Sequence, residues 1–202
     1  MLLAALALVL ALLASACGGS SAAPAGQLRG QVVSPAFEVD PTTFTTTGGE
    51  DFSFGDPGAR LSLVFFGYTH CPDVCPLVMS TISSALTRLD AEQREQVQLV
   101  FVTTDPPRDD AETIDAYLRG YRPDGVGAVG LSADLDDVVT VAESVGIFVA
   151  DAEELASGGY DLGSHGAQVI AVDGTGQAPV YWPQDVSSAE LAGDVATLLE
   201  ES

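Results

Sequence analysis

The order of predicted strands and helices indicates an α/β domain of three layers, in which helices flank a central mixed sheet. Two compact apolar runs, residues 60–66 and 97–103, have the length and composition of buried strands, and a helical pattern follows each of them. Near the C-terminus a hairpin signature precedes a last helical segment. Because strand–helix–strand units form parallel pairs and a hairpin adds antiparallel ones, the sheet should be mixed.

The first half of the domain contains short strands, a buried strand and a helix. Residues 28–54 are rich in Val, Thr and Phe and carry turn signals, so we expect short strands or hairpins that form an N-terminal β extension. The apolar run 60–66 ends at Gly67. Apolar residues that recur every three or four positions then predict a helix from Pro76 to about Leu89.

The second half repeats this alternation and closes with the hairpin. A strand at 97–103 ends at Asp105-Pro106-Pro107, and helices are predicted over 111–118 and 135–145, the latter terminated by Gly146. The last elements are strands at 168–172 and 179–182 around Asp173-Gly174-Thr175-Gly176, then a helix that begins at the capping box 187–190.

Composition limits the classes of function. The chain has 202 residues, with 29 acidic and 7 basic side chains, and its net charge is −22. Nucleic acids and anionic membrane surfaces require clustered positive charge, so we expect neither as a partner. With 47% apolar residues the chain should fold as one globular domain, and three Cys are too few for a disulfide scaffold.

The N-terminus resembles an export signal. Residues 1–16 form an uncharged Leu/Ala run that is short for a membrane span, and they end in Leu13-Ala14-Ser15-Ala16-Cys17, which is similar to a bacterial lipobox. We therefore predict a signal peptide at 1–16, lipidation of Cys17, a flexible tether within 17–27 and a folded domain at 28–202. The protein would then lie on the extracytoplasmic face of the cell membrane. A plain signal peptide or a short anchor helix is the alternative.

Cys71 and Cys75 remain for chemistry once Cys17 is assigned to the anchor. They lie between a buried strand and a helix, where α/β proteins commonly present their sites. Pro76 suits the first helical position, so Cys75 should fall at or beside the N-cap, where the helix end lowers a thiol pKa and favours the thiolate. A purely structural disulfide between the two is the alternative, although such a small ring restrains the unfolded chain little.

Two thiolates can bind Cu(I), zinc or an iron–sulfur cluster, and an imidazole can complete a soft site. His70 adjoins Cys71, which makes joint ligation strained, so we expect a neutral loop residue there. His165 precedes the strand at 168–172 and should open onto the same sheet edge as the cysteine loop, although a lone loop histidine is more often simply exposed. For Asp73 and Asp105 we expect solvated loop acids rather than groups that tune a metal.

The stretch VFFGYTHCPDVCP, residues 64–76, resembles the Sco/SenC family of copper-binding, thioredoxin-like proteins. Two further elements agree in order and spacing. One is the turn at residues 104–109 with Tyr117 after it, and the other is Tyr160 and His165 before Asp173-Gly174. The resemblance covers roughly residues 28–200.

This resemblance implies a thioredoxin-like domain and a copper chaperone, rather than an enzyme, that metallates the dinuclear copper site of cytochrome c oxidase subunit II. It implies Cys71, Cys75 and His165 as copper ligands, with Cu(I) or alternatively Cu(II) as the ion. The same two cysteines would form a redox pair that closes as a disulfide. The expected partner is that subunit or another extracytoplasmic cuproprotein, and the chaperone is expected to be a monomer tethered to the membrane through Cys17.

Two other functions compete with copper delivery. A thiol–disulfide oxidoreductase would use the same cysteines on extracytoplasmic proteins, but the spacing is Cys-x-x-x-Cys rather than the Cys-x-x-Cys of thioredoxin-like redox motifs. Residues 164–168 also lack the proline that thioredoxins carry beside their substrate. A redox-inert binding module is the third possibility.

Overall fold

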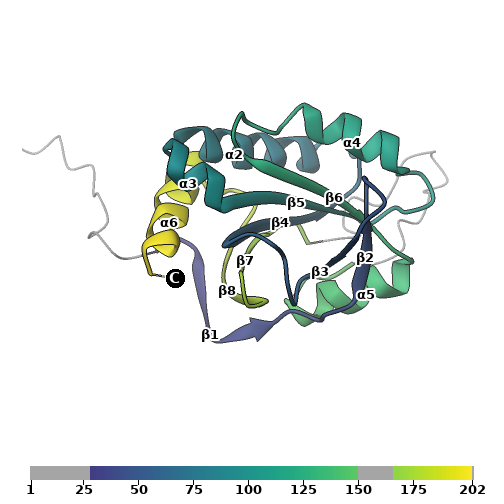
Figure 1. Ribbon diagram of the computed structural model, residues 1–202, viewed down its shortest axis with the longest axis horizontal. Helices are drawn as coiled ribbons and strands as arrows, with labels where there is room; N and C mark the ends of the chain where they lie inside the picture. Colours follow the sequence, from purple (N-terminus) through teal and green to yellow (C-terminus); the bar gives the residue numbers. More distant parts are fainter. Residues whose placement is uncertain (1–27, 150–165, 202) are drawn as a thin grey trace, which may run out of the picture.

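An eight-stranded mixed sheet runs through the computed structural model, which describes residues 28–149 and 166–201 (Figure 1). Its strand order is β1-β8-β7-β4-β5-β6-β2-β3. The strands are β1 (Gln31–Glu38), β2 (Thr43–Thr46), β3 (Asp51–Ser53), β4 (Leu61–Gly67), β5 (Val97–Thr103), β6 (Gly127–Ser132), β7 (Val169–Asp173) and β8 (Gln177–Trp182). The helices are α2 (Val74–Arg88), α3 (Ala91–Gln96), α4 (Ala111–Arg119), α5 (Leu135–Ser144) and α6 (Ser188–Glu201).

The sheet is mixed, as the sequence predicts. β4 pairs in parallel with β5, and β5 with β6, while β4 with β7 and β7 with β8 are antiparallel. The predicted N-terminal extension splits between the two edges: β1 pairs with β8, and the β2–β3 hairpin pairs with β6. The α/β fold with a central mixed sheet is therefore confirmed.

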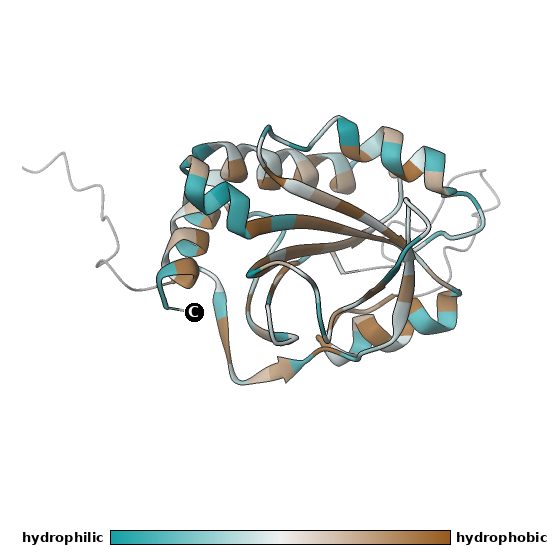
Figure 2. Cartoon of the chain, viewed as in Figure 1, coloured by the Kyte–Doolittle hydropathy of each residue, from teal (hydrophilic) through white to brown (hydrophobic). Residues whose placement is uncertain are grey.

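Three layers form because the two central strands are buried on both faces. Leu63 and Phe65 of β4 contribute to a core shared with α2, α4 and α6. Val64 and Phe66, which point to the opposite face, pack with α5 and with the N-terminal extension. Hydrophobic residues accordingly gather on the central strands and on the helix faces turned toward them (Figure 2).

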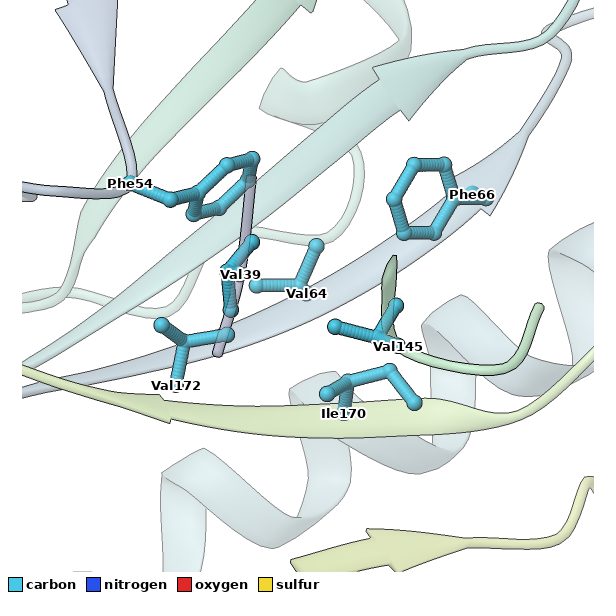
Figure 3. Close-up of a pocket in the computed structure, with 7 residues that line it drawn as sticks. All are labelled: Val39, Phe54, Val64, Phe66, Val145, Ile170 and Val172. Atoms are coloured by element: carbon cyan, nitrogen blue, oxygen red, sulfur yellow. The ribbon is translucent and has the colours of Figure 1, made fainter. Parts of the chain in front are cut away.

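The core on the α5 side of the sheet encloses a small apolar gap (Figure 3). The side chains that line it are Val39, Phe54, Val64, Phe66, Val145, Ile170 and Val172. The gap is too small for a water molecule and has no polar lining, so it is a packing defect of the core rather than a ligand site.

Two elements escape sequence prediction, for different reasons. β6 reads GAVGLS, with little β propensity, and it exists because α4 packs closely on Gly130, where a β carbon would lie 2.4 Å from Ile114 Cγ2. α3 is polar and buries none of its residues, so it has no apolar period. A capping box between Asp90 and Gln93 starts it instead.

The expected start of the helix after the cysteine loop is wrong by two residues. α2 begins at Val74 with Asp73 as N-cap, so Pro76 occupies the third helical position. Proline is tolerated there because the first N–H groups of a helix have no partner within it. The residue before a proline usually avoids helical angles, but burial of Cys75 in the core outweighs that preference.

The predicted signal peptide 1–16, the lipidation site Cys17 and the tether to residue 27 lie outside the described residues. Within residues 28–149 and 166–201, none of the helices has the length and hydropathy required to cross a bilayer.

Candidate metal centre

The cysteine loop leaves the sheet where two parallel strands end. Gly67 is the last residue of β4, and its carbonyl accepts a hydrogen bond of 2.8 Å from the Thr104 N–H just after β5. The loop then turns sharply, since the Cys71 N–H donates to the Tyr68 carbonyl at 3.2 Å. The carboxyl ends of parallel strands are the usual location of sites in α/β proteins.

The two sulfur atoms lie together at the start of α2. Cys75 is fully buried and Cys71 is 7% exposed. The backbone N–H of Cys75 donates to Cys71 Sγ at 3.4 Å, and both residues carry thiols rather than a disulfide in this structure. Because Cys75 belongs to the first turn of the helix and Cys71 to the loop, the fold places the pair at the positive end of α2.

The expected thiolate is wrong for Cys75 in the metal-free protein. The hydrogen bond with Cys71, and then burial, raise the pKa of Cys75 far above its ordinary value, although the Tyr68 backbone N–H acts in the opposite direction. Cys75 is therefore a neutral thiol at physiological pH, and a metal ion that bound there would have to displace its proton.

Gly67 leaves the room that the Cys75 sulfur needs. A β carbon at this position would lie 2.7 Å from Phe65 Cε1, 3.2 Å from Cys75 Sγ and 3.3 Å from Phe101 Cε2. The sulfur and the two aromatic rings thus pack against the side of Gly67 where any other residue would carry its β carbon. Any other residue would push the sulfur or the rings away.

Asp109 anchors the loop to β5, and the sequence analysis did not single it out. Its buried carboxylate accepts hydrogen bonds from the Thr69 N–H at 3.0 Å, Thr69 Oγ1 at 2.6 Å and Thr103 Oγ1 at 2.7 Å. The turn that carries Asp109 was visible in the sequence. Its partner Thr69 lies 40 residues away, so no local pattern joins them.

The other acids near the loop differ from one another. Asp73 is exposed at the N-cap of α2, as expected. Asp105 is buried and pairs with Arg108, whose guanidinium lies 6.0 Å from the centre of the Tyr68 ring, so the expectation of a solvated turn acid is wrong for it. This pair braces the loop from the side of β5.

Of the two histidines, His70 lies within the described residues, on the cysteine loop. The His70 side chain is 58% exposed, and its Nδ1 lies 3.0 Å from Thr69 Oγ1 and 3.5 Å from Asp109 Oδ1, consistent with a loop residue. His165 lies outside the described residues. The described chain resumes at Gly166, and Val169 pairs with Phe65, two residues before Gly67, so the chain enters β7 at the sheet edge that carries the cysteine loop.

Two thiols at one sheet edge suit a soft metal ion, and they need at least one more ligand. Within the described part of the chain, no three His, Cys, Asp or Glu side chains are grouped so that they could hold a metal. The third ligand that the family resemblance implies, His165, falls in the gap between the two described ranges.

Comparisons with known proteins bear on this arrangement. A family model described as SCO1/SenC matches residues 32–200. The chain belongs to the SCO1/SenC family.

Relatives of known structure share its fold. ScoI of Bradyrhizobium japonicum, solved with copper bound, is 29% identical, with a TM-score of 0.63 over 78% of this chain and 97% of that one. Apo Sco1 of Thermus thermophilus is 27% identical, with a TM-score of 0.70 over 89% and 99%. The fold of this SCO1/SenC domain is thioredoxin-like, as the resemblance implied.

Among curated sequences, a candidate copper-binding protein of Stutzerimonas stutzeri is 34% identical over 123 residues, 61% of this chain and 58% of its own length. This chain spans about half the length of the curated relatives that it matches, from 44% to 58%.

Proposed function

We propose that this SCO1/SenC protein is a copper chaperone. It binds Cu(I) through Cys71, Cys75 and His165 and passes it to the dinuclear site of cytochrome c oxidase subunit II or to another extracytoplasmic cuproprotein. The observation that carries the proposal is the pair of thiols held together in a braced loop at the sheet edge. The copper bound to ScoI of Bradyrhizobium japonicum supports it.

The environment of the thiols suits transfer of a soft cation. Two thiolates and an imidazole are ligands that Cu(I) prefers, and the aromatic walls beside Cys75 keep water from the ion. Cys71 is the more exposed of the two sulfurs, so an incoming thiolate of the client would displace it first. Ligand exchange would then move copper without releasing it to water.

The location of the chaperone follows from the predicted leader. Export through residues 1–16 and lipidation at Cys17 would tether the domain to the extracytoplasmic face of the membrane, where the client's copper site lies. The net charge of −22 is compatible with a cationic cargo.

The same geometry disfavours a thiol–disulfide oxidoreductase that attacks through Cys75. The attacking species in thiol exchange is the thiolate, and the pKa of Cys75 is raised. The two thiols are hydrogen-bonded to each other, so an external oxidant could join them in a disulfide, which would switch copper binding off.

A Cu(I) titration of the purified protein under reducing conditions tests the proposal. We expect one ion per protein, and a loss of affinity of about 100-fold or more in Cys71→Ser, Cys75→Ser and His165→Ala, since removing a ligand exceeds the roughly 10- to 100-fold effect of groups that support ligands. His70→Ala is the matched control and should stay within a few-fold of wild type. Unchanged affinity in His165→Ala would contradict the three-ligand site.

Transfer to a client separates the two functions. Copper-loaded protein mixed with a copper-free soluble domain of oxidase subunit II should yield the absorption spectrum of the filled dinuclear site. If the mixture instead only reduces the client's disulfide, and His165→Ala does so equally well, the protein is an oxidoreductase.

A further inference from the structure

Asp109 is an acid buried in the turn between β5 and α4, and its three hydrogen bonds join two separate segments of the chain. Oδ2 accepts from the Thr103 hydroxyl at 2.7 Å and from the Thr69 backbone N–H at 3.0 Å, and Oδ1 accepts from the Thr69 hydroxyl at 2.6 Å. The side chain is fully shielded from solvent. Burying a carboxylate costs stability unless hydrogen bonds replace its water, and here all three come from the edge of the sheet that carries the cysteines.

The turn that carries Asp109 is itself closed by hydrogen bonds. The Asp109 N–H donates to the Asp105 carbonyl at 3.0 Å, and the Asp105 N–H donates to Thr103 Oγ1 at 3.0 Å. α4 begins two residues after Asp109, with Asp110 as its N-cap. Because Asp109 is fixed to β5 and to the start of α4, its contacts with Thr69 constrain the cysteine loop.

Thr69 is the second residue of the turn that presents Cys71. The Cys71 N–H donates to the Tyr68 carbonyl at 3.2 Å, which closes a β-turn over residues 68–71, the 68–71 turn. Both the N–H and the hydroxyl of Thr69 reach Asp109, so the residue is held at two points. The position of Thr69 therefore sets where the turn places the Cys71 sulfur.

The 68–71 turn also controls access to Cys75. The Cys71 sulfur accepts a hydrogen bond from the Cys75 N–H at 3.4 Å, and Cys75 is fully buried whereas Cys71 is 7% exposed. A thiol reagent or a client sulfur that arrives from solvent can reach Cys71 in the folded site, but it can reach Cys75 only after the turn has moved. Such a movement has to break the hydrogen bonds between Thr69 and Asp109.

We propose that Asp109 is a positioning residue that holds the 68–71 turn closed through Thr69, so that Cys71 stays beside Cys75 and is the first of the two to be reached. This inference rests on the proposed copper function, in which both sulfurs are ligands. A closed turn brings the two sulfurs together before the ion arrives, so binding loses less conformational entropy and is tighter. An open turn would separate the sulfurs and expose Cys75.

Thr69→Val tests this assignment, because it removes the hydroxyl that reaches Asp109 and keeps the shape of the side chain. Without metal, iodoacetamide should alkylate Cys75 about tenfold faster than in wild type, since a hydrogen bond to a charged group no longer opposes opening of the turn. Cu(I) affinity in competition with a chelator should fall about tenfold, as for other groups that support a ligand. Tandem mass spectrometry of the tryptic fragment 61–88, which contains both cysteines, assigns the label.

Three further variants complete the experiment. Thr69→Ser keeps the hydroxyl and should retain wild-type labelling and affinity. Asp109→Ala removes all three hydrogen bonds and should exceed the effects of Thr69→Val, which carries the test alone where Asp109→Ala fails to fold. Asp194→Ala removes a buried carboxylate of α6 that accepts from Trp182 Nε1 at 2.7 Å, so it lowers global stability without touching the 68–71 turn. It should leave Cys75 labelling and copper affinity unchanged.

Wild-type labelling of Cys75 or wild-type copper affinity in Thr69→Val would overturn the proposal. An equal acceleration of labelling in Asp194→Ala would also overturn it, because the effect would then follow from global stability. Wild-type protein without a stoichiometric Cu(I) site would overturn the copper function. Labelling is measured without metal, so the response of Cys75 to Thr69→Val would still decide whether Asp109 holds the turn, and the two failures can be told apart.

Discussion

At the scale of single residues, the protonation of Cys75 is decided by the larger of two opposing effects. A helix N-terminus stabilises an anion by about 0.3–1 kcal/mol, which is less than one pKa unit. Full burial can shift a pKa by roughly 3–5 units in the other direction. The hydrogen bond of Cys75 with Cys71, together with the full burial of the thiol, therefore wins, and Cys75 keeps its proton in the metal-free protein.

A substitution at Gly67 tests whether the space beside the Cys75 sulfur matters for stability and for copper binding. Gly67→Ala would force a β carbon against Phe65, Phe101 and Cys75 Sγ, so we expect a loss of about 1–3 kcal/mol in unfolding free energy. We also expect weaker Cu(I) binding, because the sulfur has to move. Urea unfolding and chelator competition measure the two effects.

Gly193→Ala is the matched control for this substitution. Gly193 lies within α6, and a β carbon there would meet nothing within 4 Å. Alanine at a helix interior should stabilise the protein by up to about 1 kcal/mol without changing copper affinity. If Gly67→Ala behaved like Gly193→Ala, the close contact at the sulfur would not constrain the site.

At the scale of elements, buried carboxylates connect segments that are distant in the sequence. Asp109 connects the cysteine loop to β5. Asp194 of α6 accepts hydrogen bonds from the backbone N–H groups of Arg29 and Gly30 at 2.7–3.0 Å, and from Trp182 Nε1 at 2.7 Å. It therefore fastens both the entry to β1 and the end of β8 to the last helix.

Asp194→Ala should destabilise the protein by about 3 kcal/mol or more, because it leaves an indole N–H and backbone N–H groups buried without an acceptor. Chemical denaturation monitored by Trp182 fluorescence measures this. Asp124→Ala, which changes an exposed loop acid, should stay within about 0.5 kcal/mol of wild type. Equal effects of the two substitutions would contradict the anchoring role of Asp194.

At the scale of the whole molecule, the acidic side chains far outnumber the basic ones and repel one another. Seven Arg face 29 acidic residues. In the described part of the chain, arginines form ion pairs at two places, Asp105 with Arg108 and Asp115 with Arg119. Most carboxylates are therefore left to repel one another across solvent.

Salt should stabilise this protein. Raising NaCl from about 0.01 M to 1 M shortens the screening length from roughly 30 Å to 3 Å, so the melting temperature near neutral pH should rise by several degrees. Near pH 4 many carboxylates are protonated, and the same change in salt should have a smaller effect. A melting temperature that fell with NaCl at neutral pH would show that attractive ion pairs outweigh the repulsion.

The sequence by itself determined the features that depend on neighbours along the chain. The strands at β4 and β5, the glycine that ends α5 and the capping box of α6 follow from periodicity and from local hydrogen bonds. The cysteine motif likewise identified the family. The sequence did not predict β6, whose existence depends on packing, or α3, which buries none of its residues.

The tertiary structure alone decided the state of the site. Whether Cys75 is a thiol and what holds its loop depend on burial and on contacts between distant residues. Thr69 and Asp109 are 40 residues apart, and Arg29 and Asp194 are 165 apart. Desolvation and hydrogen bonds of this kind arise only when folding removes water from both partners, so no local pattern can contain them.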